Sequence, residues 1–323
     1  MSRTAYEGIE AISHKKRTIA ATVIIILLMP FTLYAGVFWL KNTGYIFLSL
    51  LIAFYTMLPF FMIFEKRKPK AREIVLIAMM IAIIVMAHLV FHMMGGVSIG
   101  TALVVVAGIS FGPEAGFLIG AISRFVLNFY QGQGAWTPWQ MVSWGLLAFL
   151  AGFVFNKLEQ DELKLSGNFR KEKMKSEHFR MVLGPLVCVF ITEVLAFCTY
   201  LLWPNGEGSF FGYRVYLAGL MGLGLGAVLQ RKKLPIDQIT LTVYTFFSVL
   251  FIYGGIMNVA TMFTSMAAPG SMGLSLETLK VYYVSGLPYD LTHAAMASVC
   301  VFLFGKPIIR KIERIKIKYG IYR

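Results

Sequence analysis

One short segment between two apolar stretches concentrates the side chains that could bind a small molecule. Residues 128–144 read NFYQGQGAWTPWQMVSW, which combines three tryptophans, three glutamines and two glycines. Indole rings can stack on a flat ligand, and amide groups supply donors and acceptors for its edges. Such polar groups are costly in a membrane unless they find partners, so we interpret the segment as a binding loop. The predicted binding residues in it are Gln131, Gln133, Trp136, Trp139, Gln140 and Trp144.

Polar residues in other apolar stretches extend this set. Arg124 lies well inside its predicted helix, where a guanidinium normally has a partner, so we expect it to pair either with Asp290 or with an anionic group on a ligand. Asp290 and His293 follow Pro288 and are expected in the first turn of the last helix, on one face. The set is completed by Asn128 and Asn258, which are expected at helix ends and either contact the ligand or cap the helix.

The composition places these residues in a membrane protein. Of the 323 residues, 58% are hydrophobic and 14% are charged, which is more apolar surface than a soluble protein of this length buries. The three cysteines lie in apolar stretches without a Cys-x-x-Cys pair, and His88 and His92 have no third ligand nearby. We therefore predict an all-α polytopic membrane protein without a disulfide or a metal site.

Apolar segments predict about ten transmembrane helices. The segments are 18–40, 44–64, 73–93, 97–111, 114–129, 138–156, 181–203, 212–230, 236–258 and 288–304. Two of them, 97–111 and 114–129, are short and meet at Gly112-Pro113, which predicts a tight hairpin.

The distribution of lysine and arginine predicts the orientation, because these residues concentrate on the cytoplasmic side of membrane proteins. If both termini are cytoplasmic, 26 of the 30 basic residues fall on that side, in 1–17, 65–72, 157–180, 231–233 and 305–323. The binding loop then faces the outside. The net charge of +14 is therefore read as an orientation signal and an attraction to anionic lipid, not as a nucleic-acid footprint.

Several motifs in this sequence occur together in one known family. They are Arg72-Glu73 before Ala78-x-x-x-Ala82, the segment FGPEAGF at 111–117, GQGAWTPWQM at 132–141 followed by Trp144-Gly145, LPYDL-x-H at 287–293, and the basic tail IERIKIKYG at 312–320. With them the chain resembles the substrate-binding S component of energy-coupling factor (ECF) vitamin transporters.

The resemblance implies a bacterial plasma-membrane protein with a six-helix core and a vitamin site open to the outside. It also implies an ECF transmembrane coupling subunit that docks on Ala78 and Ala82, and two ATPase subunits that use ATP and magnesium. This chain has no Gly-x-x-x-x-Gly-Lys-Ser/Thr loop, so we expect it to be no enzyme and to hold no cofactor.

The six-helix core is assigned to 73–156 and 236–304, which leaves two added helix pairs at 18–64 and 181–230. The expected parts are 1–64 (basic segment and added hairpin), 65–180 (four core helices and a basic loop), 181–233 (inserted hairpin) and 234–323 (two core helices and a basic tail).

The expected substrate is cobalamin or a corrinoid precursor, while riboflavin-like and pterin-like compounds remain open. Two other functions were weighed. A membrane-embedded enzyme would use Asp290 and His293 as an acid–base pair. A self-sufficient secondary transporter would use Arg124, Glu193 and Asp290 as an ion-coupling chain and would accumulate substrate without ATP.

Overall fold

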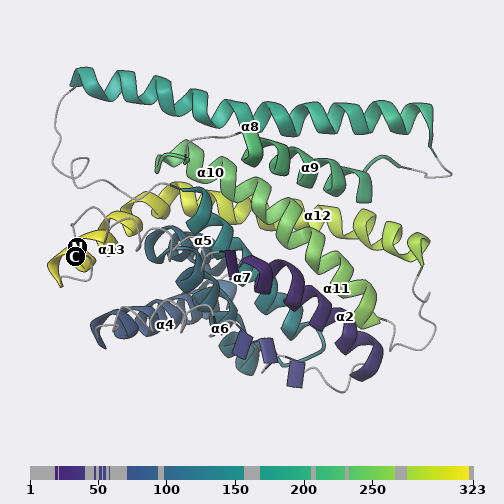
Figure 1. Ribbon diagram of the computed structural model, residues 1–323, viewed down its shortest axis with the longest axis horizontal. Helices are drawn as coiled ribbons and strands as arrows, with labels where there is room; N and C mark the ends of the chain where they lie inside the picture. Colours follow the sequence, from purple (N-terminus) through teal and green to yellow (C-terminus); the bar gives the residue numbers. More distant parts are fainter. Residues whose placement is uncertain are drawn as a thin grey trace, which may run out of the picture.

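The computed structural model describes residues 19–20, 22–40, 47–48, 51–52, 54–55, 58, 71–93, 98–155, 168–204, 209–229, 233–265 and 275–319. Every named element within these ranges is helical, which confirms the predicted all-α class (Figure 1). The helices are α2 (Met29–Leu40), α4 (Ala71–Met93), α5 (Ile99–Phe111), α6 (Pro113–Gln131), α7 (Thr137–Val154), α8 (Asn168–Leu202), α9 (Tyr213–Leu229), α10 (Gln238–Phe247), α11 (Gly255–Ser265), α12 (Leu276–Cys300) and α13 (Lys306–Lys318). Three π-helical segments adjoin them: η1 (Ile24–Leu28), η3 (Ser248–Gly254) and η4 (Val301–Gly305).

Five helical stretches in the described ranges are long and apolar enough to cross a membrane. They are Ala71–Phe91, Thr137–Val154, Leu183–Leu202, Gln238–Ser265 and Leu276–Lys318. This agrees with a chain that crosses the membrane several times. The predicted N-terminal basic segment and most of the predicted helix 44–64 lie outside the described residues, so the predicted total of ten helices stays a prediction.

The predicted hairpin at Gly112-Pro113 is confirmed. α5 ends at Phe111, Gly112 has a φ of 90°, and Pro113 opens α6 at the position where its missing N–H costs nothing. α5 is buried from Ile99 to Ser110, which explains how so short an apolar helix is accommodated: it lies inside the bundle and not against lipid. The hairpin therefore forms the centre of the helix packing.

Glycines allow α5, α6 and α7 to touch through their backbones. A Cβ at Gly108 would overlap the carbonyl oxygen of Ala148, and a Cβ at Gly120 would lie 2.6 Å from the carbonyl oxygen of Trp144. Gly116 lies against Gly108, since its Cβ would be 2.7 Å from that Cα. The spacing of Gly116 and Gly120 by four residues thus marks internal packing between neighbouring helices.

Substituting Gly108 by alanine is expected to destabilise the protein by about 1–3 kcal/mol, because α5 and α7 must separate to admit the methyl group. The measurement is the thermal unfolding midpoint of the detergent-purified chain. Gly224→Ala is the matched control, because a Cβ there meets nothing within 4 Å and alanine is the better helix former. Equal midpoints for the two variants would contradict close packing at Gly108.

The last two membrane stretches are longer than predicted. The helix expected at 236–258 continues through η3 and α11 to Ser265, so Asn258 lies inside a helix and not at its outer end. The helix expected to begin at Pro288 begins at Leu276, because the hydroxyl of Ser275 accepts a hydrogen bond from the backbone N–H of Thr278 and caps it. Asp290 and His293 are therefore mid-helix residues, and their predicted place in a first turn is wrong.

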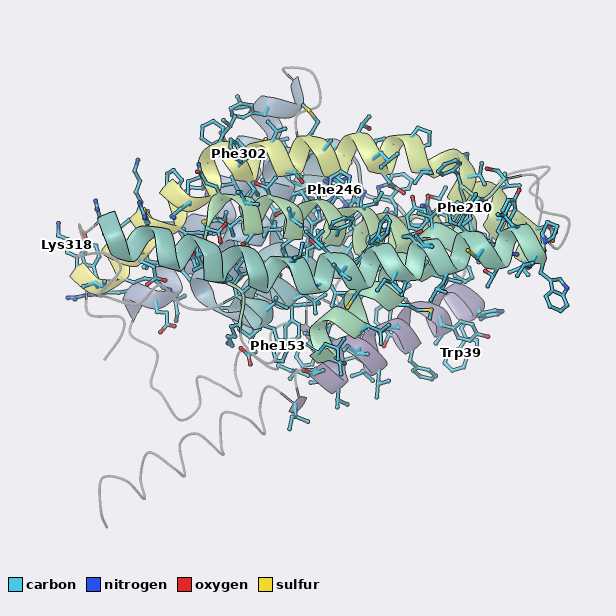
Figure 2. All side chains as sticks on the ribbon, turned by 90° about the horizontal axis from the view of Figure 1, so that it is seen from above. Trp39, Phe153, Phe210, Phe246, Phe302 and Lys318 are labelled. Carbon is cyan, nitrogen blue, oxygen red and sulfur yellow. The ribbon has the colours of Figure 1, made fainter. Side chains whose placement is uncertain are left out.

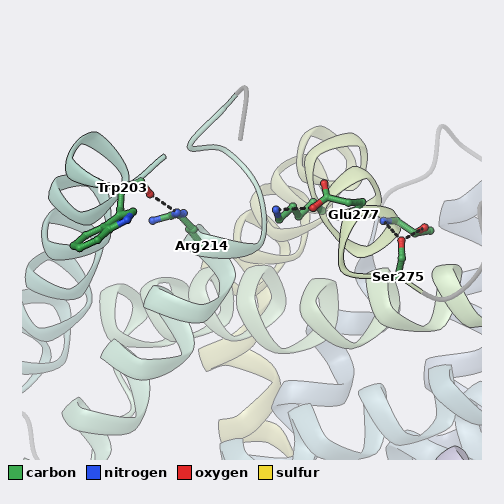
Figure 3. Close-up of polar contacts among 6 residues, drawn as sticks. Trp203, Arg214, Ser275 and Glu277 are labelled. Carbon is green, nitrogen blue, oxygen red and sulfur yellow. Dashed lines mark hydrogen bonds and ion pairs between the residues drawn. The ribbon is translucent and has the colours of Figure 1, made fainter. Parts of the chain in front are cut away.

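The two ends of the bundle carry different side chains, with Lys318 at one end and Trp39 toward the other (Figure 2). We call the end that carries α13 the basic end; the start of α4 lies there too, since Arg72 Nη1 donates to the carbonyl oxygen of Tyr319 at 3.4 Å. We call the opposite end the tryptophan end. It holds Trp203, whose carbonyl oxygen accepts a hydrogen bond from Arg214 Nη2 at 2.9 Å (Figure 3).

The α6–α7 loop also lies at the tryptophan end. The ring of Trp139, in the first turn of α7, stacks on Phe263 near the end of α11 with 5.5 Å between centroids. At the other end of α7, the backbone N–H of Leu234 donates to the carbonyl oxygen of Val154. The start of α7 is thus beside the end of α11, and at the start of α12 Glu277 and Lys280 form an ion pair at 3.0 Å.

At the basic end, α13 is attached to α5. The buried ammonium of Lys316 donates to the carbonyl oxygen of Ser110, lies 3.1 Å from Glu313 Oε1 and lies over the ring of Phe111. A lysine at the C-terminal end of a helix interacts favourably with the helix dipole and the last carbonyl groups. The part of the basic tail that forms α13 is therefore packed against the bundle.

Candidate functional site

A polar cluster joins α6 to the start of α7 near the tryptophan end. Arg124 Nε donates to Gln140 Oε1 at 2.9 Å, and Arg124 Nη1 donates to Gln131 Oε1 at 3.0 Å. Both acceptors are neutral amide oxygens. The guanidinium also lies 5.3 Å from the ring centroid of Trp144, as a cation over an aromatic face. We call Arg124, Asn128, Gln131, Thr137, Gln140 and Trp144 the Arg124 cluster.

Thr137 holds this cluster and the loop together, although it was not among the predicted residues. Its hydroxyl accepts hydrogen bonds from Asn128 Nδ2 at 3.0 Å and from the backbone N–H of Gly134 at 3.1 Å. Asn128 Nδ2 also donates to Gln140 Oε1 at 2.8 Å. The sequence signal for Thr137 was its position directly before Pro138 at the start of α7, because threonine hydroxyls at turns often form hydrogen bonds with nearby backbone groups.

Gln133 is tied to the same hairpin, since its Nε2 donates to the carbonyl oxygen of Phe125 at 3.2 Å. The predicted amide residues Asn128, Gln131, Gln133 and Gln140 are thus brought together, and their hydrogen bonds shape the loop and orient Arg124. Two of their buried oxygens, Asn128 Oδ1 and Gln133 Oε1, have no hydrogen-bond partner among the described residues. These oxygens are available to a donor on a ligand.

The three loop tryptophans have different environments. Trp144 is buried, with Arg124 over its ring and His88 against its edge at 5.4 Å between centroids. Trp139 is stacked on Phe263, and Trp136 is 43% exposed at the tip of the loop. Only Trp136 therefore leaves much of its ring free, whereas Trp139 and Trp144 form packed walls.

A second cluster lies between α9, α11 and α12. Asp290 accepts hydrogen bonds from the hydroxyl of Tyr216 and from Asn258 Nδ2, the latter at 2.8 Å. All three side chains are buried, and the ring of Tyr283 packs against Tyr216 at 4.7 Å between centroids. We call Tyr216, Asn258, Tyr283 and Asp290 the Asp290 cluster. It brings Asn258 and Asp290 together and adds a tyrosine from a predicted inserted helix.

Two glycines leave the space that the side chains of the Asp290 cluster occupy. A Cβ at Gly254 would lie 2.7 Å from the carboxyl carbon of Asp290, and a Cβ at Gly286 would overlap the amide of Asn258. These contacts place the carboxylate and the amide against the backbones of η3 and α12. The cluster is thus a packed part of the bundle and not a loose surface group.

His293 has contacts of its own, outside the two clusters. Its Nε2 shares a hydrogen bond with the hydroxyl of Thr101 at 2.9 Å, and its ring packs edge-on against Tyr253 at 4.7 Å. These contacts fix the ring of His293 against α5 and η3.

Of the two partners expected for Arg124, Asp290 is not the one that the structure shows. Asp290 is held by Tyr216 and Asn258, and no ion pair joins it to Arg124, whose acceptors are the two glutamines. Asp290 and His293 have different hydrogen-bond partners, so they do not form the bonded acid–base pair that an enzyme would use.

The predicted docking residues lie on a different surface. Ala78 and Ala82 are exposed on α4, one turn apart, among exposed large side chains that include Val75, Met79 and Ile83. Small residues at this spacing let another membrane helix approach closely. The surface is separate from the Arg124 cluster, so docking and substrate binding can be tested independently.

Residues 68–205 match the family model described as "ECF-type riboflavin transporter, S component". No curated protein and no solved structure matches the chain. The matched range contains α4 to α8, and with them the whole Arg124 cluster and the exposed pair Ala78 and Ala82. The match supports the family expected from the sequence motifs, an S component of the ECF type, over residues 68–205.

Proposed function

We propose that this chain is the substrate-specific component of an ECF-type vitamin uptake transporter in a bacterial plasma membrane. The tryptophan end faces outside and the basic end faces the cytoplasm, in keeping with the distribution of lysine and arginine. The chain binds a vitamin from outside at the Arg124 cluster. An ECF transmembrane subunit that docks on α4, and two ATPase subunits with ATP and magnesium, supply the energy.

The observation that carries this proposal is the location of the Arg124 cluster within the matched residues. A buried asparagine and an arginine are costly in a membrane bundle, and beside a buried tryptophan they are typical of a substrate site there. The same range exposes a small-residue face suited to a helical partner. A substrate site and a partner surface on one chain are the two parts that an S component requires.

Two substrates are candidates. Cobalamin or a corrinoid precursor was expected from the sequence, and the matched family model is named for riboflavin. Both are large, flat-ringed compounds with polar edges, which suits a site built from aromatic rings and amides. We propose a vitamin of this class and keep both compounds as probes.

The proposed function predicts binding without accumulation by the isolated chain. Purified protein in detergent should bind a vitamin with a sub-micromolar Kd, measured by calorimetry with riboflavin and cyanocobalamin and by mass spectrometry of co-purified compounds. Vesicles that contain this chain alone should retain no more vitamin than their binding sites hold. Accumulation above that level without ATP would favour the secondary transporter, and absence of any vitamin bound would contradict the proposal.

A further inference from the structure

Arg124 has a positive charge but no negative partner among the described residues. Its two hydrogen bonds go to the amide oxygens of Gln131 and Gln140. The carboxylate of Asp290 is used by Tyr216 and Asn258. A guanidinium at this depth is costly when unpaired, and amides compensate its charge only in part. The site is therefore electrostatically incomplete without an anion.

Hydrogen-bond donors are also left over in this region. A guanidinium has five N–H groups, and the two hydrogen bonds of Arg124 within the described chain leave about three without an acceptor. The indole Nε1 of Trp144, a residue only 1% exposed, has no acceptor among the described residues either. Arg124 lies over this same indole. A group rich in acceptor oxygens would satisfy donors that are now unsatisfied.

The guanidinium is already oriented for such a group. Its Nε donates a hydrogen bond to Gln140 and its Nη1 donates one to Gln131. Gln140 is itself fixed by a hydrogen bond from Asn128. A planar guanidinium with a fixed direction can bind a carboxylate or a phosphate through two parallel hydrogen bonds. A guanidinium that is already oriented loses less conformational freedom on binding, so the entropic cost of binding is smaller.

We propose that the cargo of this transporter carries a carboxylate or a phosphate and that Arg124 binds that group. The inference rests on the proposed function and names the substrate class of the same site. It excludes cationic vitamins, because their charge would face the guanidinium. Between the two candidate compounds, it favours cobalamin, which contains a phosphodiester, over the neutral riboflavin; a phosphorylated flavin would also qualify.

Matched ligands that differ in their anionic group test the charge directly. The matched probes are flavin mononucleotide and riboflavin, biotin and its methyl ester, and pantothenate and pantothenol. Cyanocobalamin and dicyanocobinamide are added as a corrinoid pair that differs by the whole nucleotide, phosphodiester included. Calorimetry on the full-length chain in detergent gives a Kd for each. In whichever pair binds, the anionic member should bind at least about 10-fold more tightly, as expected for one charge-assisted contact. A neutral member that binds equally well would overturn the inference.

Variants then assign the charge preference to Arg124. Arg124→Gln should bring the two members of the pair to similar affinity, whereas Arg124→Lys should keep part of the preference. Arg214→Gln is the matched control, since Arg214 lies at the same end of the bundle but bonds the carbonyl oxygen of Trp203. A preference that survives in Arg124→Gln would move the anion site elsewhere. If the wild-type chain binds no probe at all, the proposed function fails together with this inference.

Discussion

Replacing Ala82 by leucine is expected to abolish vitamin transport while the Kd for the vitamin stays unchanged. Ala82 and Ala78 are exposed on one face of α4, and leucine adds three carbons at the point where a partner helix is expected to touch the backbone. The Arg124 cluster makes no use of either residue. Transport is measured as uptake in cells that express the whole complex, and assembly as co-purification of the coupling subunit with this chain.

The matched control for this experiment is Ala295→Leu. Ala295 is an exposed alanine on α12, so the substitution adds the same three carbons to a different surface. Ala295→Leu should assemble and transport normally, and Ala78→Leu should fail in the same way as Ala82→Leu. A normal complex with Ala82→Leu would place the partner on another face, and a lost Kd would mean that α4 also shapes the substrate site.

Local sequence signals predicted the central helices well. Gly112-Pro113 marked the α5–α6 junction because glycine accepts a positive φ and proline favours the first turn of a helix. The same rule failed at Pro288, which lies inside α12. The earlier cap at Ser275 set the start of that helix, and packing against α10 and α11 outweighs the cost of an internal proline.

The sequence also predicted one part of the candidate site better than the other. The partners of Arg124 are 7 and 16 residues away on one helical hairpin, so a single polar segment in the sequence contained them. The partner of Asp290 on α9 is Tyr216, 74 residues away. No periodicity or spacing connects residues so distant, because only the packing of α9 against α12 brings them together. The sequence therefore predicted the first cluster as a unit and the second only as isolated residues.

The role of Tyr216 bears on the predicted inserted helix pair, for which the sequence suggested no purpose. α9 packs closely on α8, since a Cβ at Gly222 would be 2.5 Å from the Cα of Val189 and a Cβ at Gly226 would be 2.9 Å from the Cα of Pro185. Through Tyr216, this pair reaches the carboxylate on α12. The predicted inserted pair thus supports the side of the bundle that carries Asp290 and, one turn later, His293.

Asp290→Ala is expected to lower the free energy of unfolding by about 3 kcal/mol. The substitution leaves two buried donors, the Tyr216 hydroxyl and Asn258 Nδ2, without their acceptor, and each such group costs about 1–3 kcal/mol. The measurement is the thermal unfolding midpoint in detergent. Tyr216→Phe should cost less, because it removes only one of the two hydrogen bonds. Tyr319→Phe is the control, since that residue, directly after α13, is 47% exposed.

A double-variant cycle separates this network from a general loss of packing. If Tyr216 acts through Asp290, the double variant Tyr216→Phe with Asp290→Ala should lose less stability than the two single variants together, because each removes the same hydrogen bond. Additive losses would mean that Tyr216 stabilises the bundle only through its ring contact with Tyr283. A higher midpoint for Asp290→Ala would show that burying the carboxylate costs more free energy than its two hydrogen bonds contribute. The Asp290 cluster would then serve binding and not stability.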